Sequence, residues 1–137
     1  MAREALTFER ILICRTDSVA DVVLTLPLAG YLKQRHPGVQ IDFLVSAYAA
    51  PLVRQSRFVD QVLAIEEHAD HRRMFVDGGY DTVIFAFPHR RLAQAARRAR
   101  VANRVGTSHK LFHLFSCNRL AHFSRVRSLL HEAQLNF

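Results

Sequence analysis

A short polar stretch, residues 15–21 (RTDSVAD), holds the side chains best suited to chemistry in the first half of the chain. It combines a cation, Arg15, a hydroxyl, Ser18, and a carboxylate, Asp21. A fixed carboxylate can accept a proton from a bound hydroxyl, and an arginine can pair with a phosphate or carboxylate of the same substrate. The alternative is structural, because a carboxylate in this place also caps a helix or stabilises its dipole. The residue types leave both roles of Asp21 open.

Two apolar segments flank this stretch and would position it. Residues 10–15 form a short, β-branched apolar run that is typical of a strand buried on both faces. Residues 22–36 have helical spacing, and Pro27 is expected to kink that helix or mark an irregular first turn. The loop between strand and helix would therefore face the free amides of a helix start, which favour anions.

The same alternation of strand and helix continues along the chain. Further strands are predicted at residues 39–45, 59–65, 80–87 and, briefly, within 101–106; helical segments are predicted at 47–55, 66–77 and 90–102, and helical or irregular structure at 110–120 and 128–136. This order predicts a doubly wound α/β domain, with a mostly parallel, Rossmann-like sheet covered on both faces. Ligands bind such sheets outside the carboxyl ends of the strands, which is where residues 15–21 would lie.

Charge is distributed unevenly. Residues 1–87 hold 9 Lys/Arg and 11 Asp/Glu, whereas residues 88–131 hold 10 Lys/Arg and no acid, and the whole chain has a formal charge of +7. A one-signed surface of this kind attracts polyanions such as phosphorylated sugars, anionic lipid headgroups or nucleic acid. The alternative is a solvated basic face with no partner.

Several classes of site and location are disfavoured. No GxGxxG or Walker sequence occurs, which argues against nicotinamide and ATP-type binding. Cys14 and Cys117 have no zinc spacing, and His68 with His71 belongs to no recognised metal cluster, so no metal and no cofactor are expected. The start of the chain lacks a secretory signal and no apolar run is long enough to span a membrane, which predicts a cytoplasmic protein.

Residues 15–27 (RTDSVADVVLTLP), followed by 32–37 (LKQRHP), resemble the opening of the heptosyltransferases of glycosyltransferase family 9, which assemble the lipopolysaccharide inner core. Further pieces follow in the family's order: 41–46 (IDFLVS), 49–51 (AAP), 80–84 (YDTVI), 104–108 (RVGTS), 114–115 (LF), 118–119 (NR) and 131–132 (HE). Each piece is weak by itself, and the ordered series, covering nearly the whole chain from about Arg10, is fairly specific.

The resemblance implies one half of a two-domain glycosyltransferase-B architecture. Residues 1–137 would be the amino-terminal, acceptor-side Rossmann-like domain, and the donor-binding domain would lie outside this chain. The implied activity is transfer of a sugar from a nucleotide-sugar to an acidic lipopolysaccharide-core acceptor, without a metal or cofactor and with peripheral contact at the inner membrane. Alone, the chain is expected to be inactive, as a fragment, a product of gene decay or half of a split enzyme, because one wall of a cleft cannot hold both substrates.

The resemblance also assigns roles to single residues. Asp21 matches the general base that deprotonates the acceptor hydroxyl, and Arg15 matches a basic residue of the acceptor or phosphate site. Lys110, with His109 as the alternative match, and more weakly Arg119, correspond to basic residues that grip the acidic acceptor.

One residue departs from the family's pattern, since Ala20 stands where the family has glycine before the aspartate. If that position needs a positive φ, alanine should cost roughly 1 kcal/mol or reshape the loop.

Two readings from other classes remain. A basic nucleic-acid-binding module would use residues 88–131, where Phe112, Phe115 and Phe123 interleave with the cations. No recognised nucleic-acid motif supports it, so no nucleic acid is expected as a partner. A catalytically dead interaction protein is the other alternative, and it is compatible with Ala20.

Overall fold

The structure is a computed structural model that describes residues 8–86 and 89–106. Its strands are β1 (Arg10–Cys14), β2 (Gln40–Val45), β3 (Gln61–Ala64), β4 (Thr82–Phe85) and β5 (Asn103–Val105). Its helices are α1 (Val19–Arg35), α2 (Ala50–Val53), the 3-10 turn η1 (Ile65–Glu67), α3 (His71–Gly78) and α4 (Arg90–Arg98). The helical or irregular segments expected at 110–120 and 128–136 lie outside the described residues.

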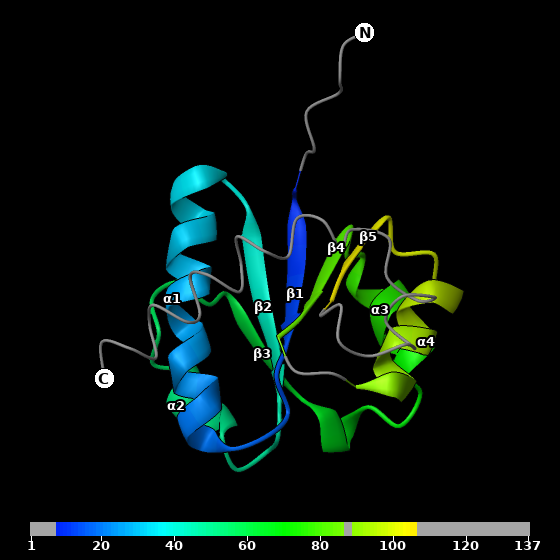
Figure 1. Ribbon diagram of the computed structural model, residues 1–137, viewed down its shortest axis with the longest axis horizontal. Coiled ribbons are helices and arrows are strands. Elements are labelled where there is room, and N and C mark those ends of the chain that lie inside the picture. Colours follow the sequence, from blue (N-terminus) through cyan, green and yellow to red (C-terminus); the bar gives the residue numbers. More distant parts are fainter. Residues whose placement is uncertain (1–7, 87–88, 107–137) are drawn as a thin grey trace, which may run out of the picture.

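The five strands form one parallel sheet in the order β3-β2-β1-β4-β5 (Figure 1). The prediction of a doubly wound, mostly parallel α/β fold is therefore confirmed, and the brief fifth strand is present. The chain moves outward from β1 to β2 and β3, and then crosses back to β4 on the other side of β1. This reversal leaves a topological switch point between the carboxyl ends of β1 and β4, the usual ligand position in such sheets.

Helices cover both faces of the sheet because the central strands are apolar on both faces. In β1, Ile11 and Ile13 belong to the core beneath α1 and α2, whereas Leu12 and Cys14 belong to the core beneath α3 and α4. Figure 1 shows these two helix pairs on opposite sides of the strands. The carboxyl ends of the central strands are thus held between two buried apolar layers.

Helix α1 begins at Val19, earlier than the residue 22 expected from the apolar spacing. Pro27 lies well inside α1 and not in its first turn, so the expectation of an irregular first turn is wrong. The helix continues through the proline because its inner face is firmly packed, with Val22, Thr25 and Leu28 buried. Among the described residues, no helix is both long and apolar enough to pass through a membrane.

Candidate functional site at the carboxyl end of the sheet

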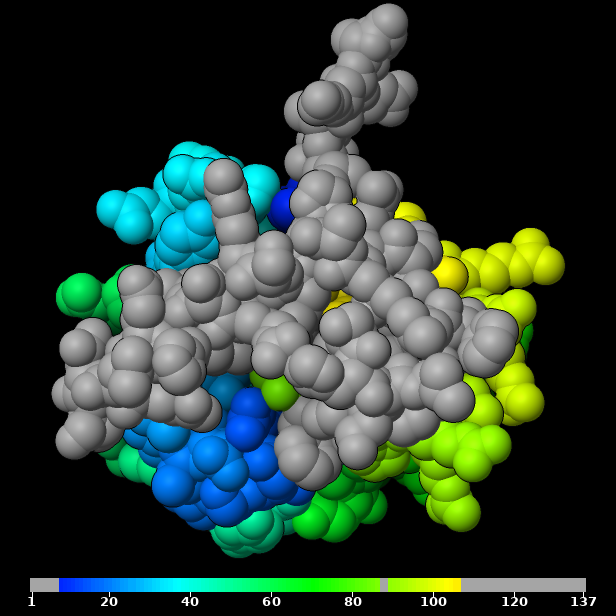
Figure 2. All heavy atoms as spheres, in the orientation of Figure 1, coloured from blue at the N-terminus to red at the C-terminus, as the bar shows by residue number. Residues whose placement is uncertain are grey.

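The loop 15–21 is fixed where three strands end. The Arg15 backbone N–H donates to the carbonyl of Leu44 at the end of β2 (3.0 Å), and the Ala86 N–H after β4 donates to the carbonyl of Cys14 (3.1 Å). The Ser46 hydroxyl after β2 donates to the carbonyl of Thr16 (2.9 Å). The loop therefore lies at the predicted place, beside the switch point, and Figure 2 shows the first turns of α1 at the molecular surface.

Arg15 spans the switch point with its guanidinium. Nε and Nη2 donate to the two carboxylate oxygens of Asp17 at 3.0 and 3.1 Å, and Nη1 donates to the carbonyl of Ala86 at 2.9 Å. The Arg15 side chain is 12% exposed and the Asp17 side chain 17%. This is a bidentate, largely desolvated arginine–carboxylate pair, which is the strongest geometry such pairs adopt.

Asp21 lies in the first turn of α1, beside this ion pair. Its Oδ1 lies 3.5 Å from Arg15 Nη2, and its Oδ2 accepts a hydrogen bond from the Ser18 hydroxyl at 2.8 Å. Ser18 is the N-cap of α1, and its hydroxyl oxygen also accepts the Asp21 backbone N–H (3.2 Å). Both readings of Asp21 are thus compatible with the geometry, because the carboxylate supports the helix start and remains 38% exposed at the edge of the sheet.

The two carboxylates differ in acidity. The hydrogen bond from Ser18, with smaller contributions from Asp17 and Arg15, holds the pKa of Asp21 below its usual range. Burial raises the pKa of Asp17, although the Arg15 guanidinium opposes that rise. Neighbouring carboxylates often separate in this way, because ionisation of one disfavours ionisation of the other. Asp21 is therefore the more acidic and the more exposed of the two carboxylates.

Asp17 and Tyr48 are the parts of this site that sequence reasoning missed. The Tyr48 hydroxyl donates to the Asp17 backbone carbonyl at 2.8 Å, and the Tyr48 ring is 63% exposed beside the loop. A signal for Asp17 was available, since a carboxylate two residues after an arginine in a tight loop can fold back onto it. Tyr48 comes from the turn after β2 and offered no local signal.

Ala20 does not carry the backbone strain considered for it. It lies in the first turn of α1, and Arg100 is the only non-glycine residue with a positive φ within the described part of the chain. The condition under which alanine would be costly is therefore not met. Ala20 is exposed in that turn.

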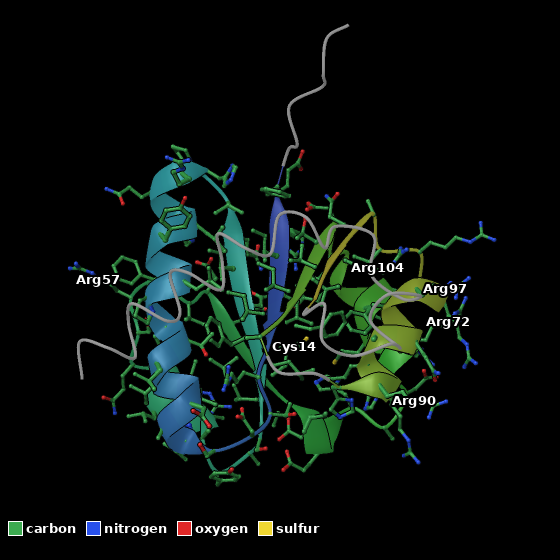
Figure 3. All side chains as sticks on the ribbon, in the orientation of Figure 1. Cys14, Arg57, Arg72, Arg90, Arg97 and Arg104 are labelled. Atoms are coloured by element: carbon green, nitrogen blue, oxygen red, sulfur yellow. The ribbon has the colours of Figure 1, made fainter. Side chains whose placement is uncertain are left out.

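The basic segment is not part of this site as far as the structure describes it. Arg90, Arg91, Arg97 and Arg98 are exposed on α4. In Figure 3 the labelled Arg90, Arg97 and Arg72 point outward from the side of the molecule that carries α3 and α4. Lys110, His109 and Arg119 lie outside the described residues, so their role in gripping the acidic acceptor stays a prediction.

A shallow groove with a volume of about 660 Å³ runs along the surface between α3 and α4. Its lining includes Asp70, His71, Arg72, Arg91, Gln94 and Arg98. The ring of His71 stacks edge-on against His89 at a centroid distance of 6.2 Å, and burial, reinforced by nearby positive groups, lowers the pKa of both histidines. No group of three or more potential metal ligands occurs within residues 8–86 and 89–106.

Solved structures of glycosyltransferases share this fold. The glycosyl transferase family 9 protein from Veillonella parvula aligns with a TM-score of 0.70 at 21% identity, over 91% of this chain and 42% of its own. The E. coli heptosyltransferase WaaC with ADP aligns with a TM-score of 0.64 at 26% identity, over 90% of this chain and 46% of its own. E. coli ADP-heptose lps heptosyltransferase II aligns with a TM-score of 0.61 at 20% identity, over 72% of this chain and 30% of its own.

These alignments confirm the resemblance to family 9 heptosyltransferases at the level of structure. The chain spans less than half the length of these solved neighbours. No protein-family model and no curated protein matches the sequence.

Proposed function

We propose that this chain forms the acceptor-side wall of a heptosyltransferase-type glycosyltransferase, which transfers a sugar from a nucleotide-sugar to a lipopolysaccharide-core acceptor. The observation that carries the proposal is the placement of an ionised, partly exposed Asp21 against Arg15 at the switch point of the sheet. The structural similarity to WaaC, at 26% identity over 90% of this chain, supports the same reading.

In the proposed reaction the acceptor hydroxyl attacks the anomeric carbon of the donor. The new glycosidic C–O bond forms as the bond to the nucleoside diphosphate breaks, with inversion at that carbon, and the hydroxyl proton passes to Asp21. A carboxylate with a lowered pKa is a weak base, so this proton moves late, when bond formation has made the acceptor oxygen acidic. Ser18 and Arg15 hold the carboxylate in place through the contacts to its two oxygens.

The donor needs a second binding surface, facing the acceptor side. Near-attack geometry requires the anomeric carbon within about 3–3.5 Å of the acceptor oxygen, and a single domain edge does not fix both partners. WaaC has been solved with ADP and with ADP-2-deoxy-2-fluoro heptose. We therefore propose a nucleotide-sugar donor held by a donor-binding domain beyond this chain, and an acidic acceptor whose charged groups meet Lys110 and Arg119.

Acceptor binding by the chain tests this proposal directly. A Kdo-bearing lipid A acceptor, titrated into isotope-labelled protein, should shift the amide signals of Ser18 and Asp21, and Asp21→Asn should weaken that binding. Asp60→Asn is the matched control, because the Asp60 side chain is similarly exposed (40%) and pairs with Lys33 away from the loop. Salt-dependent binding of oligonucleotides, with no response to the acceptor, would instead support the nucleic-acid alternative.

The transfer step is tested by supplying the second wall. A donor-binding domain expressed separately and mixed with this chain, with ADP-heptose and the same acceptor, should restore transfer. Recovery would count against the interaction-protein alternative. Acceptor binding without any transfer under these conditions would support that alternative.

Peripheral membrane contact, expected from the resemblance, is best served by the exposed arginines of α4. Arginine near an anionic bilayer contributes about 1 kcal/mol per residue, so the four arginines Arg90, Arg91, Arg97 and Arg98 suffice for reversible binding. Co-sedimentation with vesicles of phosphatidylglycerol in phosphatidylcholine should fall with rising salt and with Arg91→Gln/Arg98→Gln, and retention by neutral vesicles alone would contradict this assignment.

A further inference from the structure

We propose that Asp17 determines what the loop 15–21 recognises: by occupying the Arg15 guanidinium, it makes the loop select a neutral, hydroxyl-bearing part of a ligand over a phosphate or carboxylate. The inference rests on the proposed function only in naming that ligand as the reacting part of a sugar acceptor. The acidic groups of such an acceptor would then be bound elsewhere.

Asp17 occupies the edge of the Arg15 guanidinium that an anion would use. An anion binds arginine best through two parallel hydrogen bonds to one edge of the guanidinium. Asp17 already uses the Nε–Nη2 edge, with both bonds at about 3 Å. Nη1 donates to the Ala86 carbonyl, and Asp21 Oδ1 lies 3.5 Å from Nη2. An incoming phosphate would have to displace a carboxylate of the protein itself.

Burial and anchoring keep the pair in this state. Both side chains are less than one-fifth exposed, so separating them would leave a poorly solvated charge on each side. The Tyr48 hydroxyl fixes the backbone of Asp17 from the neighbouring turn. Arg15 is therefore a fixed part of the wall, with its charge directed at the two aspartates.

Charge gives the same selectivity. The loop holds the carboxylates of Asp17 and Asp21 and the single cation Arg15, so its sum is negative when both acids are ionised. Glu66, whose Oε1 accepts the Ala47 N–H beside Tyr48, adds a further negative charge. A neutral polyol donates hydroxyl protons to such a surface, whereas an anion is repelled by it.

Phosphate binding by the chain is the test, and it does not depend on transferase activity. Inorganic phosphate, titrated at constant ionic strength, should give no saturable shift of the Arg15 Nε–H signal in the unaltered protein. Asp17→Ala should create saturable phosphate binding at Arg15, with an apparent affinity at least 10-fold higher than that of the unaltered protein. Asp17→Asn keeps one acceptor oxygen, so its phosphate affinity should lie between those of the unaltered protein and Asp17→Ala. Asp60→Ala is the control, because it also removes one negative charge and leaves Lys33 without its carboxylate partner. In this variant the Arg15 Nε–H signal should not respond to phosphate.

The outcomes separate cleanly. Equal phosphate binding at Arg15 with and without Asp17, in proteins whose circular dichroism is native, overturns the inference, as does saturable binding to the unaltered chain. If Asp17→Ala does not fold, Asp17→Asn alone decides between these results. A gain of phosphate binding together with failure of the acceptor to bind the unaltered chain would support the selectivity of Asp17 while rejecting the proposed acceptor.

Discussion

The loop 15–21 and the exposed face of α4 both depend on charged side chains, and they use them in opposite ways. In the loop, Arg15 and Asp17 are largely buried and joined by two hydrogen bonds of about 3 Å. On α4, four arginines are exposed, and within the described residues none of them forms an ion pair with an acid. The loop has fixed charges at defined positions, whereas α4 presents a diffuse positive field.

This difference separates positioned chemistry from general attraction. Charges held in a partly desolvated site act on one atom of a bound ligand and are weakly screened by salt. Exposed arginines attract any polyanion and lose that attraction as salt increases. Substitutions in the loop should therefore be costly and specific, and substitutions on α4 should be mild and additive.

The largest expected effect concerns Asp21. With the donor wall supplied, Asp21→Asn should lower the rate of sugar transfer by about 10²–10⁴-fold, because the amide cannot accept the acceptor proton. The loss should appear in kcat more than in KM. Asp60→Asn, at similar exposure, should leave the rate unchanged. Equal rates for Asp21→Asn and the unaltered enzyme would reduce Asp21 to a helix-capping residue.

Arg15 gives the next largest effect, on stability. Arg15→Leu leaves Asp17 partly buried without its cation and the Ala86 carbonyl without its donor, which should cost about 2–4 kcal/mol in the free energy of unfolding. Arg98→Leu on α4 should change it by no more than about 0.5 kcal/mol. Urea denaturation of both variants measures the contrast, and similar losses would show that burial does not distinguish the two regions.

The sheet was predictable because its signals are local. Each central strand is a short apolar run bounded by polar residues, and both faces of such a run must be buried. The strands expected at 10–15, 39–45 and 80–87 therefore differ from β1, β2 and β4 only at their ends. The position of residues 15–21 at the carboxyl edge followed from the alternation of strand and helix.

The composition of the site was only partly predictable, because its contacts depend on the path of the loop. The residue types suggested that Arg15 would grip a ligand, and they did not reveal that Asp17 already holds it. Ala20 was judged by a conditional argument about φ, and only the early start of α1 shows that the condition fails. The run of basic residues beyond residue 88 indicated that α4 would be positively charged. It did not indicate that α4 would lie on the opposite face of the sheet from α1.

Ser18 links the start of α1 to the Asp21 carboxylate. Its hydroxyl caps α1 and donates to Asp21, so Ser18→Ala should cost about 1 kcal/mol in stability and raise the pKa of Asp21 toward its ordinary value. Ser18→Thr should retain both effects. Thermal unfolding and a carboxyl titration by NMR report the two consequences independently. A loss of stability with an unchanged Asp21 pKa would mean that the cap and the carboxylate are not coupled.

The smallest expected effect is on the pH dependence of stability, and it comes from His89, the N-cap of α4. Its Nδ1 accepts the Leu92 N–H at 3.2 Å as the N-cap of α4, which requires that nitrogen to be unprotonated. Burial, with His71 and Arg91 nearby, lowers the pKa of His89 below its ordinary 6.5. The unfolded chain then binds more protons than the folded chain just below pH 6.5. The contribution of His89 to stability is therefore complete above that pH and falls as the solution is acidified toward the pKa of His89 in the folded chain.

His89→Asn keeps a capping oxygen and has no proton to gain, so it should flatten the loss of stability between pH 7.5 and 5.5. An unchanged slope in His89→Asn would place the pH dependence with His71 instead.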